Sequence, residues 1–176
     1  MKKTTVINLA SGPGSGKSTL AAEMFSKMKK IGLDVELVTE YAKELVYQED
    51  FTTLSNQVIV TQEQCRRQLV FKDKVEYMVT DSPIFLGMHY SDDYQFLQVE
   101  KIIKANWDLY ENVIIDVKRS EDYVQKGRRE SKEESKEIDN NIRKLIGIFS
   151  SGPCLKYSRR DDVTALIDMI RYKKES

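Results

Sequence analysis

The apolar residues of this chain fall into short runs that are separated by longer, amphipathic segments. Five such runs lie at residues 5–10, 34–39, 76–80, 112–117 and 154–157. Short apolar runs of this kind are typical of strands buried on both faces of a parallel sheet. Because a helical segment separates successive runs, we predict a three-layer α/β fold with a central, mainly parallel five-stranded sheet.

Between these runs, apolar residues recur at the spacing of one helix face. Residues 20–28 show this pattern, and Gly32 follows at the position that commonly ends a helix. A Ser-x-x-Glu capping box at residues 131–134 precedes an apolar stripe over residues 138–149. We predict helices in both segments, and further helices over residues 41–47, 58–72, 96–107 and 163–172.

The length and composition are those of a single globular domain over residues 1–176. Of the 176 residues, 40% are hydrophobic and 32% are charged, which suits a core that needs no metal or disulfide support. No apolar run approaches the ~20 residues that cross a bilayer, so we expect no membrane association. Cys65 and Cys154 lie far apart and outside any Cys/His cluster, which argues against a disulfide framework or a zinc site and favours the cytoplasm.

The segment between the first predicted strand and the first predicted helix has the layout of a phosphate-binding loop. Residues 11–19 read S-G-P-G-S-G-K-S-T. Glycines let the backbone close around an oligophosphate with its N–H groups inward, and the following helix presents its positive dipole end to the same anion. In this motif Lys17 reaches the β- and γ-phosphates and the Ser18 hydroxyl binds Mg²⁺. Ser11 stands where the consensus G-x-x-x-x-G-K-[ST] has its first glycine.

Carboxylates follow two of the predicted strands, and ligands of open α/β sheets bind beyond the carboxyl ends of the strands. Asp81 ends an apolar run, where a P-loop protein places the acid that holds Mg²⁺; the alternative is a capping residue before Ser-Pro. Glu40 follows the second run and is expected to face the same crevice, where it would orient and deprotonate an acceptor hydroxyl. The alternative is an acid that only favours the dipole of the next helix.

Basic residues concentrate after the fourth predicted strand, around a possible hinge at Gly127. They are Lys118, Arg119, Lys126, Arg128 and Arg129. We predict a lid over about residues 118–134, in which Arg128 is the best candidate to neutralise charge on a transferring phosphoryl group and Arg129 is a weaker one. Alternatively, these charges form a solvated face.

Two other polar features are open to two interpretations. His89 is the single histidine and has no Ser or Cys motif beside it, which favours a packed or surface residue over a catalytic one. Four side chains of the helix predicted over residues 58–72 either read a base or sugar or form a polar face: Gln62, Gln64, Arg66 and Arg67.

These motifs together resemble the ribosylnicotinamide-kinase-like group of P-loop ATPases and kinases, over most of the chain. The matching features are the strand and phosphate loop, T-E-Y-A-K-E at residues 39–44, a Gln-bearing helix, T-D-S at residues 80–82 and G-R at residues 127–128. The sequence looks closest to small bacteriophage-encoded members, some of which phosphorylate 5-hydroxymethyluracil bases in viral DNA. Lys43 stands where Arg often follows Glu-Tyr-Ala or Glu-Tyr-Gly, and Lys lacks the planar fork of Arg.

The resemblance implies a P-loop kinase that transfers a phosphoryl group from ATP, with Mg²⁺, to a hydroxyl of a nucleoside, nucleotide or modified base. It implies Mg²⁺ near Ser18 and Asp81, acceptor contact at Glu40 and a lid arginine at Arg128. Catalysis would come mainly from positioning and charge stabilisation, with Lys17 clamping the transferring group. The loop that would bind ATP comprises Gly12, Pro13, Gly14, Ser15, Gly16, Lys17, Ser18 and Thr19.

Two other functions stay open at this point. A nucleotide-dependent switch or assembly protein would hydrolyse ATP without an acceptor, and it would not need Glu40; a GTP switch is disfavoured because the chain has no Asn/Thr-Lys-x-Asp motif. The second open function is that of a kinase that acts on DNA itself. The 28 basic and 28 acidic residues leave no general field that would attract nucleic acid, although a local basic rim would still do so.

Overall fold

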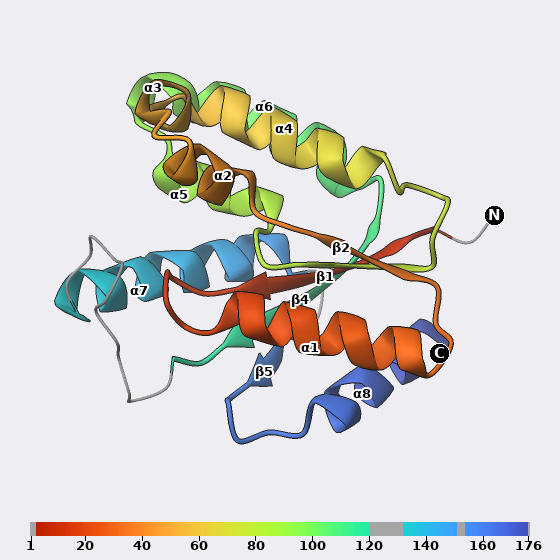
Figure 1. Ribbon diagram of the computed structural model, residues 1–176. Helices are drawn as coiled ribbons and strands as arrows, with labels where there is room; N and C mark the ends of the chain where they lie inside the picture. Colours follow the sequence, from red (N-terminus) through yellow and green to blue (C-terminus); the bar gives the residue numbers. More distant parts are fainter. Residues whose placement is uncertain (1–2, 120–131, 151–153, 176) are drawn as a thin grey trace.

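A five-stranded, entirely parallel sheet forms the centre of the protein (Figure 1). The computed structural model describes residues 3–119, 132–150 and 154–175. The strands lie in the order β2-β3-β1-β4-β5. Their bounds are Thr5–Ala10 for β1, Val35–Val38 for β2, Tyr77–Thr80 for β3, Glu111–Val117 for β4 and Leu155–Tyr157 for β5. The predicted α/β class and the five predicted strands are confirmed, and each strand end agrees with the prediction to within one residue.

Strand β1 lies in the middle of this sheet, and all six of its residues are buried. The first residue of β1, Thr5, pairs with Tyr77 of β3 on one side and with Glu111 of β4 on the other. After β1 the chain builds β2 and β3 on one side before it crosses to β4 and β5. Since the direction of winding reverses at β1, the loop that follows this strand lies at the topological switch point, where open α/β sheets bind ligands.

Helices cover both faces of the sheet and complete the three layers (Figure 1). The bounds are Lys17–Lys30 for α1, Tyr41–Tyr47 for α2, Phe51–Ser55 for α3, Gln57–Leu69 for α4, Ile84–Leu86 for the 3-10 turn η1, Gly87–Tyr90 for α5, Asp93–Trp107 for α6, Lys132–Phe149 for α7 and Val163–Glu175 for α8. The short elements α3, η1 and α5 were not predicted, because they are too short to show a helical period. Side-chain caps start several helices; Asp50, for example, accepts a hydrogen bond from the Thr53 N–H at the start of α3.

The predicted lid over about residues 118–134 is described only at its ends. Lys118 and Arg119 follow β4, and residues 120–131 lie outside the described part of the chain, together with the predicted cap at Ser131. Helix α7 begins at Lys132, so the last residues of the predicted lid coincide with the first turn of this helix.

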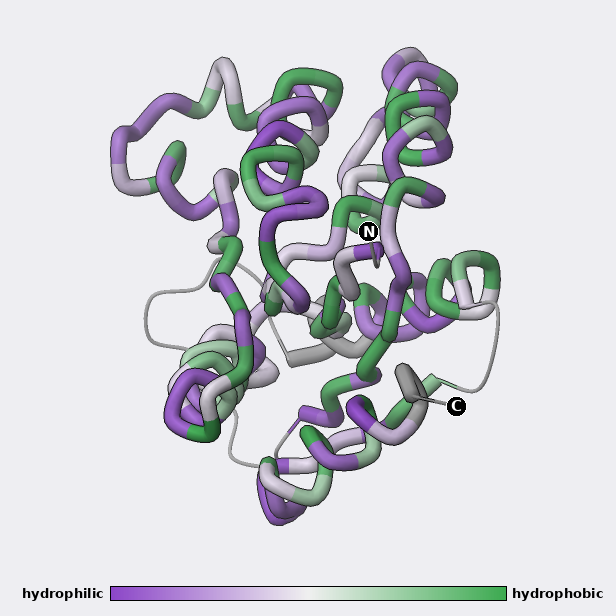
Figure 2. Tube along the Cα trace, turned by 90° about the vertical axis from the view of Figure 1, so that its right-hand side faces the viewer, coloured by the Kyte–Doolittle hydropathy of each residue, from purple (hydrophilic) through white to green (hydrophobic). Residues whose placement is uncertain are grey.

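The core is divided by the sheet into two main clusters. On one face, α1 and α8 pack against the strands through residues such as Met24 and Ile167. On the other face, α4, η1, α6 and α7 pack around Phe85, which is fully buried. The Phe85 ring stacks on Phe149 at 5.4 Å and meets Trp107 edge-on at 5.6 Å. Hydrophobic and hydrophilic residues alternate along the helices, as expected for helices with one buried side (Figure 2).

The aromatic cluster generates a prediction about stability. Phe85→Ala removes a fully buried ring that contacts Trp107 and Phe149, so the free energy of unfolding is expected to fall by about 3–5 kcal/mol. Urea denaturation followed by circular dichroism measures this change. Tyr94→Ala is the matched control, because the Tyr94 side chain is 92% exposed and its loss should change stability by less than about 0.5 kcal/mol. Equal losses of stability from the two substitutions would contradict the placement of Phe85 in the core.

Candidate active site

The loop between β1 and α1 closes in the shape that its glycines permit. Gly14 and Gly16 have φ values of 77° and 95°, a region that L-residues with a Cβ rarely adopt. Among the described non-glycine residues, only Glu49 and Asp73 have a positive φ. Ser11 therefore occupies the first position of the motif without backbone strain, which explains why glycine is not required there.

Lys17, the first residue of α1, folds back over this loop. Its ammonium donates hydrogen bonds to the carbonyl oxygens of Ser11, at 2.8 Å, and Gly12, at 2.9 Å. Burial lowers the pKa of Lys17, and the carboxylates of Glu40, Asp81 and Asp139 oppose that shift. The ammonium is thus held inside the loop, within electrostatic reach of three acids.

Asp81 lies just beyond β3 and faces the start of α1. Its Oδ2 accepts a hydrogen bond of 2.5 Å from the Ser18 hydroxyl, and its other carboxylate oxygen is buried without a hydrogen-bond partner among the described residues. Asp81 does not cap the next element, because Pro83 is the N-cap of η1 and the Ser82 N–H bonds instead to Thr80. The alternative interpretation of Asp81 as a capping residue is therefore wrong.

The pair Ser18 and Asp81 fits a magnesium ion chemically. Mg²⁺ prefers oxygen ligands and is commonly held by one or two protein groups together with water and substrate phosphates. A hydroxyl and a carboxylate with an unpaired oxygen meet that requirement. Within residues 3–119, 132–150 and 154–175, no three His, Cys, Asp or Glu side chains gather into a site that would hold a metal by themselves.

Glu40 lies at the N-cap position of α2, and Thr39 separates it from the end of β2. Its side chain makes no capping hydrogen bond, so any support that it gives to the helix start comes from its charge beside the dipole of α2 and not from a cap. Burial raises the pKa of Glu40, the charge of Lys17 lowers it, and Asp81 raises it further. Glu40, Lys17 and Asp81 therefore influence one another at the carboxyl ends of β1, β2 and β3.

Helix α4 holds the segment around Glu40 in place. Gln64 is buried, its amide nitrogen donates to the carbonyl of Thr39 at 3.2 Å, and its amide oxygen accepts from the N–H of Tyr41 at 3.0 Å. These two bonds flank Glu40 on either side. The possibility that Gln64 reads a base is thus not supported, since both ends of its amide are engaged within the protein.

The other polar residues of α4 make contacts on the protein surface. Arg67 forms a bidentate ion pair with Glu44 of α2, with bonds of 2.7 and 2.5 Å, and lies 5.0 Å from the ring of Tyr41. Arg66 pairs with Glu63 at 2.6 Å and is exposed, as is Gln62. For Gln62 and Arg66, the interpretation as the polar face of a helix fits the structure; Arg67 instead joins α4 to α2.

The basic residues after β4 are only partly described. Arg119, one of the basic residues at the start of the predicted lid, forms an ion pair with Asp139 of α7, with an Nε–Oδ2 distance of 3.1 Å. The sequence offered no signal for Asp139, which lies 20 residues further along the chain. Lys126, Gly127, Arg128 and Arg129 lie outside the described residues.

Other sequence features lie apart from the loop. His89 packs against the ring of Tyr90 at 4.7 Å, and burial lowers the pKa of His89, which agrees with a packed residue. Cys65 and Cys154 are free cysteines, as expected.

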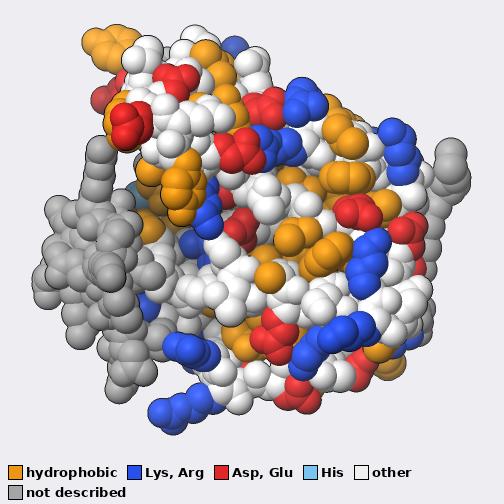
Figure 3. Space-filling view, in the orientation of Figure 1, with side chains coloured by type: hydrophobic (Ala, Val, Ile, Leu, Met, Phe, Trp, Pro, Cys, Tyr) orange, Lys and Arg blue, Asp and Glu red, His pale blue; other side chains and the backbone are white. Residues whose placement is uncertain are grey.

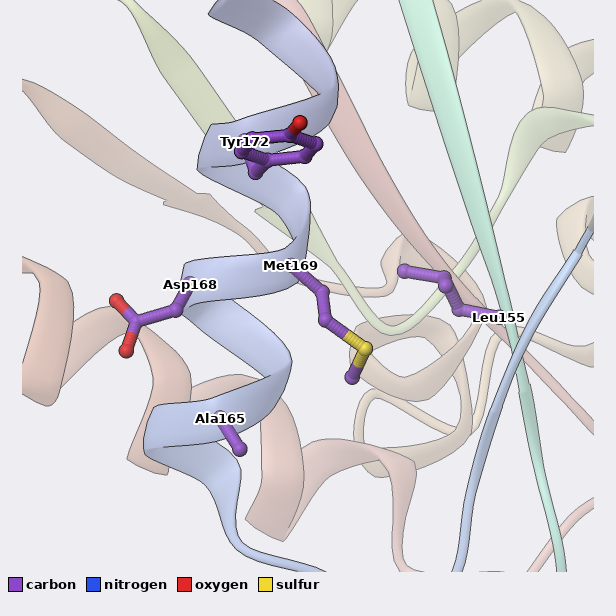
Figure 4. A pocket seen from close by; sticks show the side chains of 5 residues that line it. All are labelled: Leu155, Ala165, Asp168, Met169 and Tyr172. Atoms are coloured by element: carbon purple, nitrogen blue, oxygen red, sulfur yellow. The ribbon is translucent and has the colours of Figure 1, made fainter.

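A shallow pocket of about 500 Å³ lies between β5 and α8, and its lining contains no residue of the loop (Figure 4): Leu155, Ala165, Asp168, Met169 and Tyr172. None of the described helices is both long enough and apolar enough to cross a membrane.

Comparison with known proteins places the chain in a family. The family described as AAA domain matches residues 6–150, which is most of the chain and includes the loop. No curated protein sequence matches the chain.

Several solved structures share the fold at low sequence identity. Thymidylate kinase from Ehrlichia chaffeensis is 15% identical, over 98% of this chain and 100% of that one, with a TM-score of 0.65. Deoxyadenosine kinase from M. mycoides with bound dATP is 18% identical over 97% and 99%, with a TM-score of 0.61. NadR protein in complex with NR is 14% identical over 98% of this chain but only 52% of that one, with a TM-score of 0.64. The chain therefore belongs to the AAA domain family, and it has the fold of P-loop nucleoside and nucleotide kinases.

Proposed function

We propose that the protein is a Mg²⁺- and ATP-dependent phosphotransferase that acts on a hydroxyl group. The observation that carries this proposal is the meeting of Lys17, Asp81 and Glu40 beside the phosphate loop. The loop, Lys17 and Asp81 suit any protein that binds a nucleotide. Glu40 is an additional carboxylate that ATP binding alone does not require. A kinase needs such a group on the side where the acceptor binds.

Each residue of the site takes a defined part in this reaction. The loop from Gly12 to Thr19 binds the ATP phosphates, and Lys17 neutralises negative charge on the β- and γ-phosphates. Ser18 and Asp81 would hold Mg²⁺, which would supply positive charge to stabilise the negative charge that develops on the phosphates. Arg128 contributes a guanidinium to the transferring group; this part of the proposal rests on the sequence alone, because Arg128 lies outside the described residues.

Glu40 orients the acceptor hydroxyl and accepts its proton. Burial raises the pKa of this carboxyl, which brings it closer to neutral pH than that of an exposed glutamate. A base of this kind takes a proton more effectively, while the charge of the neighbouring Lys17 opposes the rise in its pKa. Gln64 binds the backbone on both sides of Glu40 and so holds this residue at the carboxyl end of the sheet.

The acceptor belongs to the nucleosides, nucleotides or modified bases. Support for this class comes from the molecules named for three similar structures, which are the thymidylate kinase, the deoxyadenosine kinase and NadR in complex with NR. A hydroxymethylated base in phage DNA, such as 5-hydroxymethyluracil, is one member of this class. On the face shown in Figure 3, basic and acidic side chains are interspersed, which favours a small acceptor over a long stretch of DNA.

The acceptor class is tested by a screen for ATP consumption. Free nucleosides, nucleotides, plain DNA and hydroxymethylated DNA are each offered to the wild-type protein with Mg-ATP. Phosphorylation of one of these acceptors is the expected result. ATP hydrolysis that no acceptor stimulates would instead favour a nucleotide-dependent switch or assembly protein, and activity on DNA that falls steeply with salt would favour the DNA-acting enzyme.

Asp81→Asn tests the magnesium site. The amide keeps an oxygen for the Ser18 hydroxyl but removes the charge that attracts the metal, so Mg²⁺-dependent turnover should fall by roughly 10²-fold or more, while the melting temperature changes little. The measurement is turnover against Mg²⁺ concentration, with a thermal melt of each variant. Asp34→Asn is the control, because Asp34 precedes β2 and therefore lies at the amino ends of the strands, away from the site. It should retain wild-type turnover. A large loss of stability with normal turnover per folded molecule would contradict the metal role.

Glu40→Gln separates a kinase from an ATPase. Glutamine keeps the size of the side chain but cannot take a proton, so phosphoryl transfer should fall roughly 10²–10⁴-fold. Slow hydrolysis of ATP by water, which needs only the loop and the metal, should continue, whereas Lys17→Ala should lose both reactions. In the wild type, the transfer rate should decline as pH falls through the raised pKa of Glu40, because protonation removes the base.

Both rates are measured in the same preparation with the acceptor found by the screen. Glu36→Gln serves as the control, because Glu36 lies in β2, shortly before Glu40 along the chain, and pairs with Lys29 at the surface. An unchanged rate of transfer in Glu40→Gln would remove Glu40 from the mechanism.

A further inference from the structure

A buried ion pair lies against the first half of the phosphate loop. Arg119 follows β4 and Asp139 belongs to α7, and their side chains are only 12% and 8% exposed. The guanidinium donates from Nε to Oδ2 at 3.1 Å and from Nη2 to Oδ1 at 3.2 Å. This bidentate contact fixes both the distance and the orientation of the two side chains.

The pair binds the backbone of two successive residues of the loop. Asp139 Oδ1 accepts a hydrogen bond of 2.7 Å from the Gly12 N–H, and Arg119 Nη1 donates one of 2.7 Å to the carbonyl of Pro13. The Ser11 hydroxyl also approaches Asp139 Oδ1, at 3.4 Å. The residue that departs from the loop consensus therefore has a partner in the same cluster.

Gly12 is required by the closeness of this contact. A Cβ at position 12 would lie 2.5 Å from Asp139 Oδ1 and 3.1 Å from Arg119 Nη2, so no larger residue fits while the pair stays in place. The carboxylate reaches the Gly12 N–H because the glycine leaves this space open.

Lys17 holds the same stretch of loop from inside. Its ammonium bonds to the carbonyls of Ser11 and Gly12, while Arg119 and Asp139 bind the Gly12 N–H and the Pro13 carbonyl. A lysine that moves onto a phosphate oxygen loosens its own contacts with these carbonyls. Arg119 and Asp139 bind other atoms of the loop than Lys17 does, so a movement of the ammonium onto a phosphate would not itself break their hydrogen bonds.

We propose that Asp139 and Arg119 are positioning residues that preorganise the phosphate loop for a nucleoside di- or triphosphate. They act on the loop backbone and do not touch the nucleotide. A buried ion pair is costly to desolvate, and such pairs are best understood where they specify one geometry. The proposal rests on the nucleotide binding of the proposed function, but it does not depend on which acceptor is phosphorylated.

The test compares binding of Mg-ADP and of adenosine to the purified protein by calorimetry. Asp139→Asn removes the charge that pairs with Arg119, and Arg119→Lys removes the fork that reaches both Asp139 and Pro13. Each variant should bind Mg-ADP roughly 10-fold more weakly, the effect of losing one charge-assisted hydrogen bond, while its affinity for adenosine stays unchanged. A role in stability alone would lower the melting temperature without changing the ratio of the two affinities.

Arg143→Lys is the matched control, because Arg143 of α7 pairs with Asp116 of β4 at 3.6 Å and its other hydrogen bond goes to Asn140 of α7, not to the loop. It should keep the wild-type affinity for Mg-ADP. Unchanged Mg-ADP affinity in both Asp139→Asn and Arg119→Lys would overturn the positioning role. Tighter binding would also overturn it, since it would mean that the Asp139 carboxylate competes with phosphate for the loop. Absence of Mg-ADP binding by the wild type would overturn the proposed function together with this inference.

Discussion

The burial of strand β1 between β3 and β4 is the constraint on which the rest of this structure depends. All six of its residues are buried and both of its edges are paired, so the strand cannot shift without disrupting the sheet. The loop after β1 therefore begins at a fixed place in the molecule. Lys17, at the start of α1, is brought to the same edge as the residues that follow β2 and β3. Parallel pairing places Glu40 and Asp81 there as well, because parallel strands all end at the same side.

The electrostatics of the site follow from the closeness of Lys17, Glu40 and Asp81 at the carboxyl ends of the strands. Lys17 is the cation at the centre, and its pKa is lowered by burial and raised by the carboxylates of Glu40, Asp81 and Asp139. The same burial raises the pKa of Glu40, and Lys17 opposes that rise. Each of these charges is tolerated because an opposite charge is close, and the site is consequently sensitive to the loss of any one of them.

A set of supporting contacts lies behind these charges and comes from two helices. Helix α4 holds the backbone around Glu40 through Gln64, and it reaches Glu44 through Arg67. Helix α7 holds the start of the phosphate loop through Asp139, with Arg119 beside it. Both helices pack in the same apolar cluster, so the core that stabilises the fold also fixes the supporting residues in place.

The sequence by itself determined the sheet, the phosphate loop and the residues at the strand ends. Short β-branched runs, glycine spacing and a carboxylate directly after a strand are local signals, and each can be interpreted from a few neighbouring residues. The tertiary structure alone decided which partner each polar side chain takes. Gln64 meets Thr39 across 25 residues, and Asp139 meets Gly12 across 127 residues. Such pairs leave no periodic trace in the chain, because they depend on how whole helices pack against the sheet.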